Sequence, residues 1–141
     1  MGPIVNTLTN EDALRAYAAM MNTGDASILE PLLAEDFHYA SQRVFAEIES
    51  KVEYMDYIRS KLAAVKASGV HVWAEIGELE RELPGPCVLL AQGEQDNLVG
   101  LVLAEVEAER IKRLDLCIAP SPHSAIRTGE YPGRGPQRQG C

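Results

Sequence analysis

The stretch RAYAAMMNTGD, residues 15–25, decides the fold of this chain. Apolar side chains recur in and just before it at helical spacing: Leu14, Tyr17, Ala18 and Met21. Thr9 or Asn10 can cap the start of this helix. Gly24 can adopt the left-handed conformation that ends a helix. We therefore expect an amphipathic helix that begins near residue 10 and stops before Gly24.

A second helical signal and two strands come next. Asp25 can cap a short helix, whose apolar side would be formed by Ile28, Leu29, Leu32 and Leu33. Residues 37–44 alternate in polarity and contain many strand formers, which predicts a first strand, and residues 45–48 predict a short second one. Ser50 and Glu53 form a capping-box pattern. A long helix should follow and end at residues 68–69.

The second half of the chain has the pattern of a sheet. Predicted strands span residues 70–79, 87–92, 98–107 and 110–119, with turns at 84–86, 94–97 and 108–109. The last three strands would form an antiparallel meander. Proline, glycine and arginine dominate after residue 119. We therefore expect most of this tail to be irregular, ordered to about Tyr131 and mobile after Gly133.

Helices followed by a bent antiparallel sheet predict an α+β fold. We expect a cone-shaped, curved antiparallel sheet wrapped around an N-terminal helix pair and one long helix. Residues 1–119 would form this single domain, and residues 120–141 a C-terminal tail. Because a curled sheet closed by helices encloses a cavity, we expect an internal pocket.

Charge and composition narrow the classes of partner. The 141-residue chain has a formal net charge of −8, with −10 on residues 1–119 and +2 on residues 120–141. An acidic body repels phosphate backbones and argues against nucleic acid. The sequence has no apolar run long enough for a membrane span and no secretory signal, so we expect a cytoplasmic protein. Its three cysteines have no zinc-like spacing, and we expect no metal or cofactor.

Several of these residues resemble a known superfamily. The pattern Tyr17-x-x-x-x-Asn22-x-Gly24-Asp25, followed by residues 32–37 (LLAEDF), is similar to the nuclear transport factor 2-like superfamily. Its ketosteroid isomerase and polyketide-cyclase (SnoaL-like) branches are the most similar. Residues 100–107 and 110–115 resemble its last hairpin. The resemblance spans residues 10–119, implies a cystatin-like α+β barrel, and implies a homodimer formed through the exposed sheet face.

The same resemblance bears on chemistry. Tyr17 falls where ketosteroid isomerases place the tyrosine that donates to the substrate oxygen. Their base position falls on Ser41, and their second acid falls near Val102. A serine hydroxyl without an activator is a poor general base. The resemblance therefore implies a retained donor and argues against steroid isomerisation.

Candidate site residues come from the faces of the predicted elements. Tyr39 and Ser41 share a face of the first strand. The resemblance places at Tyr57, on the long helix, an aromatic residue that lines the cavity. In the strand at 87–92, Leu90 and the polar Gln92 are ligand-binding candidates, although Gln92 could also lie where the strand emerges into solvent.

The strand at 70–79 leaves its orientation open. His71, Trp73 and Glu75 share one face and valine and alanine residues occupy the other. If the first face points inward, His71 is a candidate acid or base beside Tyr17, and Trp73 a candidate ligand contact. If the aliphatic face points inward, the His-Trp-Glu face meets solvent or a partner subunit. Period-two alternation does not distinguish these arrangements.

Three functional hypotheses follow. The first is a protein that binds a small, mostly apolar molecule in the cone pocket. The second is an isomerase, cyclase, dehydratase or hydrolase that uses Tyr17 as donor and His71 or a carboxylate as base. The third is a dimerisation scaffold whose cavity is filled by side chains. The sequence does not identify the ligand.

Overall fold

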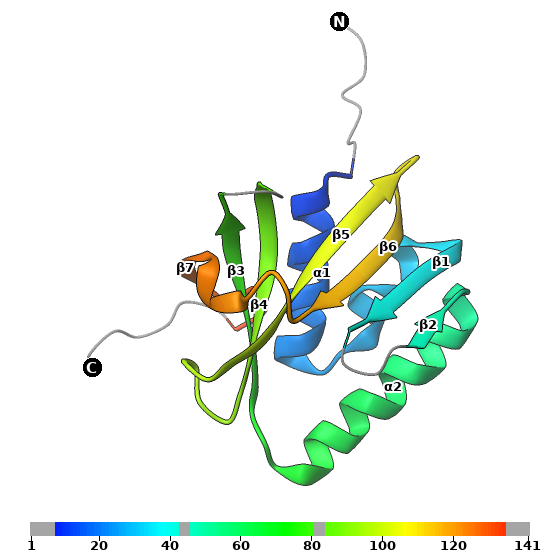
Figure 1. Cartoon of the computed structure of the whole chain (residues 1–141). Coiled ribbons are helices and arrows are strands. Elements are labelled where there is room, and N and C mark those ends of the chain that lie inside the picture. Colours follow the sequence, from blue (N-terminus) through cyan, green and yellow to red (C-terminus); the bar gives the residue numbers. More distant parts are fainter. Residues whose placement is uncertain (1–7, 43–45, 81–83, 135–141) are drawn as a thin grey trace, which may run out of the picture.

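The computed structural model describes residues 8–42, 46–80 and 84–134, which form an α+β fold around one curved sheet (Figure 1). The two α-helices are α1 (Asn10–Thr23) and α2 (Lys51–Ser68). Three short 3-10 segments are η1 (Ala26–Ile28), η2 (Glu30–Leu32) and η3 (Pro122–Ser124). The strands are β1 (Leu33–Ser41), β2 (Ala46–Ile48), β3 (Val72–Leu79), β4 (Gly85–Gln92), β5 (Leu98–Glu107), β6 (Arg110–Cys117) and β7 (Ile126–Glu130).

Both α-helices begin and end where their local sequence predicted. The Thr9 hydroxyl accepts from the amide of Asp12 at 3.0 Å, and the Asp12 carboxylate accepts from the amide of Thr9 at 3.1 Å. These two bonds form a capping box at the start of α1. Ser50 caps α2 in the same position. Both helices end at a left-handed glycine, Gly24 with φ of 78° and Gly69 with φ of 75°.

The segment after Gly24 differs from the prediction. Asp25 does cap it, but the expected second helix is only the pair of 3-10 segments η1 and η2. Leu33 belongs to β1, where it pairs with Ile111 of β6. The expectation of a helix through Leu33 was therefore wrong, because pairing with a distant strand outweighs the local helical pattern.

Several predicted strand limits also move. The strand expected at 70–79 begins at Val72, the strand expected at 87–92 begins at Gly85, and the last strand of the meander ends at Cys117. The predicted turn at residues 84–86 was thus wrong, because Gly85 and Pro86 pair with Leu79 and Glu78. Residues 43–45, part of the predicted first two strands, lie outside the described residues.

The sheet has the strand order β2-β1-β6-β5-β4-β3-β7 and is open. Neighbouring strands run antiparallel except for β1 and β6, which are parallel, so the sheet is mixed rather than wholly antiparallel. Helix α1 packs against β3, β4 and β5, and α2 packs against β1 (Figure 1). The main core lies between these helices and the concave face of the sheet.

Residues 121–134 have more regular structure than we expected. Strand β7 pairs antiparallel with β3 and forms an edge of the sheet. Tyr131 behind it is buried. The part of the tail that we expected to be mobile lies largely outside the described residues, at 135–141. Within the described chain, neither α-helix combines the length and the apolar character needed to cross a bilayer.

Candidate functional site

Four tyrosines meet between α1, α2 and the sheet, and we call them the tyrosine cluster. Tyr17 comes from the middle of α1, Tyr39 from β1, and Tyr54 and Tyr57 from the first two turns of α2. The ring centroid of Tyr39 lies 5.2 Å from that of Tyr54 and 5.6 Å from that of Tyr57. The rings are tilted relative to one another, as aromatic pairs prefer. Three separate elements therefore bring their phenols to one place in the core.

Burial determines the protonation state of this cluster. Burial raises the pKa of Tyr17, Tyr39 and Tyr54 well above the ordinary value of a phenol, and neighbouring tyrosines raise these pKa values further. The phenols of Tyr17, Tyr39 and Tyr54 therefore stay protonated at physiological pH. They can donate hydrogen bonds, but they cannot act as phenolate bases.

The hydroxyl groups of the cluster differ in their partners. The Lys61 ammonium lies 3.3 Å from the Tyr57 hydroxyl and 5.7 Å from the centre of its ring. Burial raises the pKa of Tyr39, and a hydrogen bond between Tyr39 and Ser41 lowers it by a smaller amount. The Tyr54 hydroxyl, by contrast, is buried without a hydrogen-bond partner among the described residues. Such a group is costly unless a partner reaches it, by about 1 to 3 kcal/mol.

The orientation of β3, left open by its alternating pattern, is now determined. Val72, Ala74 and Ile76 belong to the main core with the tyrosine cluster. Trp73 and Glu75 lie on the opposite, outer face, where Trp73 packs edge-on against Tyr131 at 5.9 Å between ring centroids. The inward-facing arrangement of His71, Trp73 and Glu75 therefore does not form. The outer face of β3 instead contacts residues 126–134, which we call the C-terminal segment.

The remaining predicted site residues divide into two groups. Leu90 belongs to the same core as the tyrosine cluster, and Ser41 is buried beside it. Gln92 is exposed at the end of β4, where its backbone closes a turn with Asn97. His71 is exposed just before β3, away from the interior of the cone. The structure thus brings together the predicted tyrosines with Ser41 and Leu90, and it separates His71, Trp73 and Gln92 from them.

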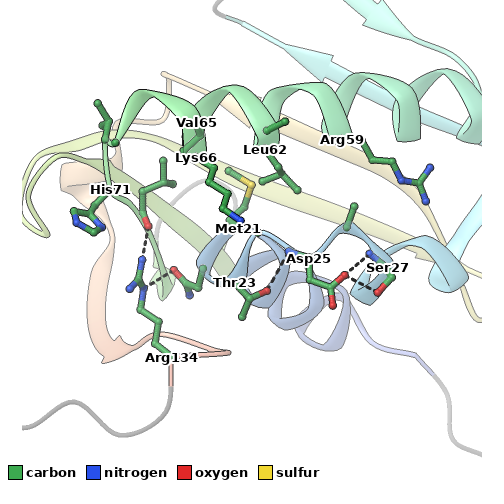
Figure 2. A pocket seen from close by; sticks show the side chains of 17 residues that line it. Met21, Thr23, Asp25, Ser27, Arg59, Leu62, Val65, Lys66, His71 and Arg134 are labelled. Atoms are coloured by element: carbon green, nitrogen blue, oxygen red, sulfur yellow. Dashed lines mark hydrogen bonds between the residues drawn. The ribbon is translucent and has the colours of Figure 1, made fainter.

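A groove lies between α1 and α2, outside the cone, and no pattern in the sequence predicted it. This α1–α2 groove has a volume of about 630 Å³ and is formed by the end of α1, η1, the C-terminal half of α2 and the start of β3 (Figure 2). Met21, Leu62 and Val72 form its floor, and all three are part of the main core. His71 and Arg134 stand at one end of the groove and Arg59 at the other (Figure 2). Its residues come from three stretches of the chain, at 21–27, 59–72 and 134, and no short motif contains such a grouping.

Within the described chain, no group of three or more histidine, cysteine, aspartate or glutamate residues is placed to hold a metal ion. Cys87 and Cys117 are buried and unpaired, as their apolar surroundings in the sequence predicted. Burial raises the pKa of Cys87 to about 11. These thiols are therefore packing groups of the outer sheet face rather than ligands or nucleophiles.

Comparison with known proteins identifies the fold. No protein-family model matches the chain, and no curated protein matches it. Among solved structures, it is similar to an NTF2-like protein of unknown function from Cytophaga hutchinsonii, with 15% identity, 85% of this chain and 98% of that chain covered, and a TM-score of 0.55. A SnoaL-like protein of unknown function from Burkholderia thailandensis is also similar, with 14% identity and a TM-score of 0.56. The match covers 88% of this chain and 100% of that chain.

A third similar structure was solved with a small molecule. It is a hypothetical protein with a ketosteroid isomerase-like fold from Catenulispora acidiphila, in complex with trimethylamine. The identity is 16%, 81% of this chain and 90% of that chain are covered, and the TM-score is 0.51. These likenesses confirm the α+β cone fold that the resemblance of the sequence implied. At such identities they carry the fold alone.

Proposed function

We propose that this chain, which has the NTF2-like fold, binds a small, mostly apolar molecule inside the cone, against the tyrosine cluster. The observation that carries the proposal is the Tyr54 hydroxyl, which is fully buried and has no hydrogen-bond partner among the described residues. A ligand oxygen that accepted this hydrogen bond would remove the cost of the unpaired group. The rest of the surroundings is aromatic and aliphatic, which suits an apolar ligand.

The chemistry of the cluster suggests what the polar part of the ligand is. Neutral phenols donate one hydrogen bond each, and the Tyr17 hydroxyl lies at the position that the resemblance assigns to an oxyanion donor. We therefore infer a ligand with one acceptor oxygen, such as a ketone or an ether, on a hydrocarbon frame. The trimethylamine complex of the Catenulispora acidiphila protein supports the capacity of this fold to take a small molecule.

Catalysis with Tyr17 as donor is the alternative, and it needs an acid or base beside that hydroxyl. Apart from the tyrosines, the described chain buries two polar or charged residues, Ser41 and Glu75. Glu75 faces the outer side of the sheet, where it binds Arg127. A binding role thus agrees better with the geometry than acid–base chemistry does. The scaffold alternative corresponds to a cone that takes no ligand at all.

Cyclic ketones compared with their parent hydrocarbons test the proposal. We expect cyclohexanone to bind more tightly than cyclohexane in ligand-observed NMR titrations, and Tyr54→Phe to remove that preference. Because Phe has no hydroxyl to desolvate, the same variant should keep the free energy of unfolding or raise it by about 1 kcal/mol. Tyr131→Phe is the matched control, since Tyr131 lies on the outer face and should not affect ketone binding.

Two results would contradict the proposal. Equal affinity for ketone and hydrocarbon in the unchanged protein would show that no buried donor meets the ligand. A loss of more than about 1 kcal/mol of stability in Tyr54→Phe would show that the hydroxyl already has a partner within the chain. If no ring compound bound at all, the filled scaffold would be the better account.

A further inference from the structure

The α1–α2 groove differs from the rest of the molecule in its charge. The protein carries a formal net charge of −8, yet the groove is lined by three cations, Arg59, Lys66 and Arg134, and by one carboxylate, Asp25. The Asp25 oxygen is engaged by the amide and hydroxyl of Ser27, at 3.0 and 2.6 Å. The groove is therefore a local positive region on an acidic protein.

Two of the three cations, Lys66 and Arg134, have no carboxylate partner among the described residues. Arg59 is paired with Glu30 at 2.6 Å. The Lys66 side chain makes no hydrogen bond or ion pair within the described chain, and Figure 2 shows its amine turned from α2 toward the end of α1. A free ammonium over a groove, rather than one bound to a neighbouring acid, is available to a ligand.

Arg134 is held in place without being neutralised. Its guanidinium donates to the carbonyl of Val72 at 2.7 Å and to the side-chain oxygen of Asn22 at 3.2 Å. It also stacks over Trp73, with 4.2 Å between the guanidinium carbon and the ring centre. Burial lowers the pKa of this guanidinium, because its charge is partly withdrawn from water. An anion near Arg134 would relieve that cost.

The walls between these cations are apolar. Met21, Leu62 and Val72 form the floor, while Val65 and Val70 lie along the sides. Val70 is exposed although it is a large apolar residue. A volume of about 630 Å³ is in the range that holds small organic ligands. Positive groups next to an apolar surface match a molecule with an anionic head and a short hydrocarbon chain.

We propose that the α1–α2 groove is a second binding site, which takes an organic anion with a short hydrocarbon chain, of the medium-chain carboxylate class. The headgroup binds the Lys66 ammonium in the positive field of Arg134, and the chain lies on Leu62 and Met21. This site is separate from the tyrosine cluster, none of whose members lines the groove. It does not depend on the ligand proposed for the cone.

Octanoate, octanol and inorganic phosphate are the probes that test this site. We expect octanoate to shift the backbone amide NMR signals of groove residues such as Ser27, Ala63 and Gly69, and to bind about threefold to fivefold more tightly than octanol in low salt. Raising the salt to about 1 M should remove most of this difference, because salt screens exposed charges. Phosphate, which lacks the chain, should bind more weakly than octanoate.

Variants of one helix separate the charge from the fold. Lys66→Gln should weaken octanoate binding about threefold to fivefold without changing octanol binding, and Lys66→Glu should weaken it about tenfold. Lys51→Gln, on the same helix but outside the groove, is the matched control and should leave both affinities unchanged. Thermal unfolding of each variant checks the fold, which Lys66 does not support through any side-chain hydrogen bond or ion pair within the described chain.

The proposal would be overturned by equal binding of octanoate and octanol, by unchanged octanoate affinity in Lys66→Gln, or by phosphate binding as tightly as octanoate. Shifts confined to cone amides such as those of Tyr39 and Leu90 would also overturn it, because they would place octanoate at the tyrosine cluster. Tyr54→Phe distinguishes the two proposals. It should abolish the ketone preference of the cone and leave octanoate binding in the groove unchanged.

Discussion

Substitution of Glu75 is the most direct test of how the C-terminal segment is attached. Glu75 on β3 is almost completely buried, and its carboxylate accepts three hydrogen bonds from that segment. The donors are Arg127 Nε at 2.8 Å, the Gly129 amide at 2.7 Å and the Tyr131 hydroxyl at 3.3 Å. Because a buried charge without partners is strongly disfavoured, the carboxylate and residues 127–131 should stabilise each other. We predict that Glu75→Gln releases this segment from β3.

The size of the effect follows from burial. Removing one member of a buried ion pair costs about 3 to 5 kcal/mol. Arg127 is about one-third exposed, with 34% of its side chain accessible, and it keeps a second partner in Asp96. Glutamine also retains one acceptor oxygen. We therefore expect Glu75→Gln to lower the free energy of unfolding by about 2 kcal/mol, a large part of the stability of a small domain.

Urea unfolding and hydrogen exchange measure the two parts of this prediction. The unfolding midpoint should fall, and its slope should fall slightly, because a released segment leaves less surface to be exposed on unfolding. Amides of β7 should lose protection more than those of β4, because the segment opens locally before the sheet unfolds. Glu78→Gln is the control on the same strand, where the side chain is exposed, and should change stability by less than about 0.5 kcal/mol.

The reasoning would be refuted by Glu75→Gln unfolding within about 0.5 kcal/mol of the unchanged protein. It would also fail if β7 amides kept their protection while the whole domain lost stability. That second result would mean that Glu75 supports the sheet itself rather than the attachment of residues 126–131. A double-mutant cycle with Arg127→Gln should give a coupling energy of about 1 kcal/mol or more.

Two further predictions concern the outer face of the sheet. An added Cβ at Gly77 would lie 2.9 Å from Leu89 Cδ1 and 3.3 Å from Cys87 Sγ. Gly77→Ala should therefore lower the free energy of unfolding in urea by about 1 to 3 kcal/mol. Unchanged stability would disprove the close packing at this position. We also predict a homodimer through the outer face. Leu103→Arg should then convert it to a monomer in light scattering, and an unchanged mass would remove Leu103 from the interface.

Helix limits could be predicted from the sequence because their causes are local. The Thr9 hydroxyl accepts a hydrogen bond from the amide of Asp12, three residues away, and the Gly24 amide donates to the carbonyl of Met20, four residues away. Ser50 and Gly69 make bonds of similarly short range on α2. The alternation of residues 37–41 also placed Tyr39 and Ser41 correctly on one buried face. Local geometry was sufficient in each case.

The misplaced segments have causes that lie far away in the chain. Leu33 joins a strand because Ile111 offers it backbone partners, although its neighbours favour helix. The outward face of β3 is covered because Arg127 and Tyr131 reach Glu75 from more than fifty residues away. Gly129 and the prolines near β7 suggested an irregular tail. The edge of β3 nevertheless pairs with residues 126–130 and stabilises a strand there. Tertiary pairing outweighs propensity at such positions.

The C-terminal segment also links the outer face of β3 to the α1–α2 groove. Glu75 binds Tyr131, Tyr131 packs edge-on against Trp73, and Trp73 supports the guanidinium of Arg134. Arg134 in turn provides a cation at one end of the α1–α2 groove. Loss of the Glu75 carboxylate should therefore loosen this series of contacts, while Arg134 keeps its hydrogen bonds to Val72 and Asn22. The tyrosine cluster has no such dependence, because its side chains come from α1, β1 and α2. The groove is thus completed by the C-terminal segment, whereas the interior of the cone is formed by the body of the domain alone.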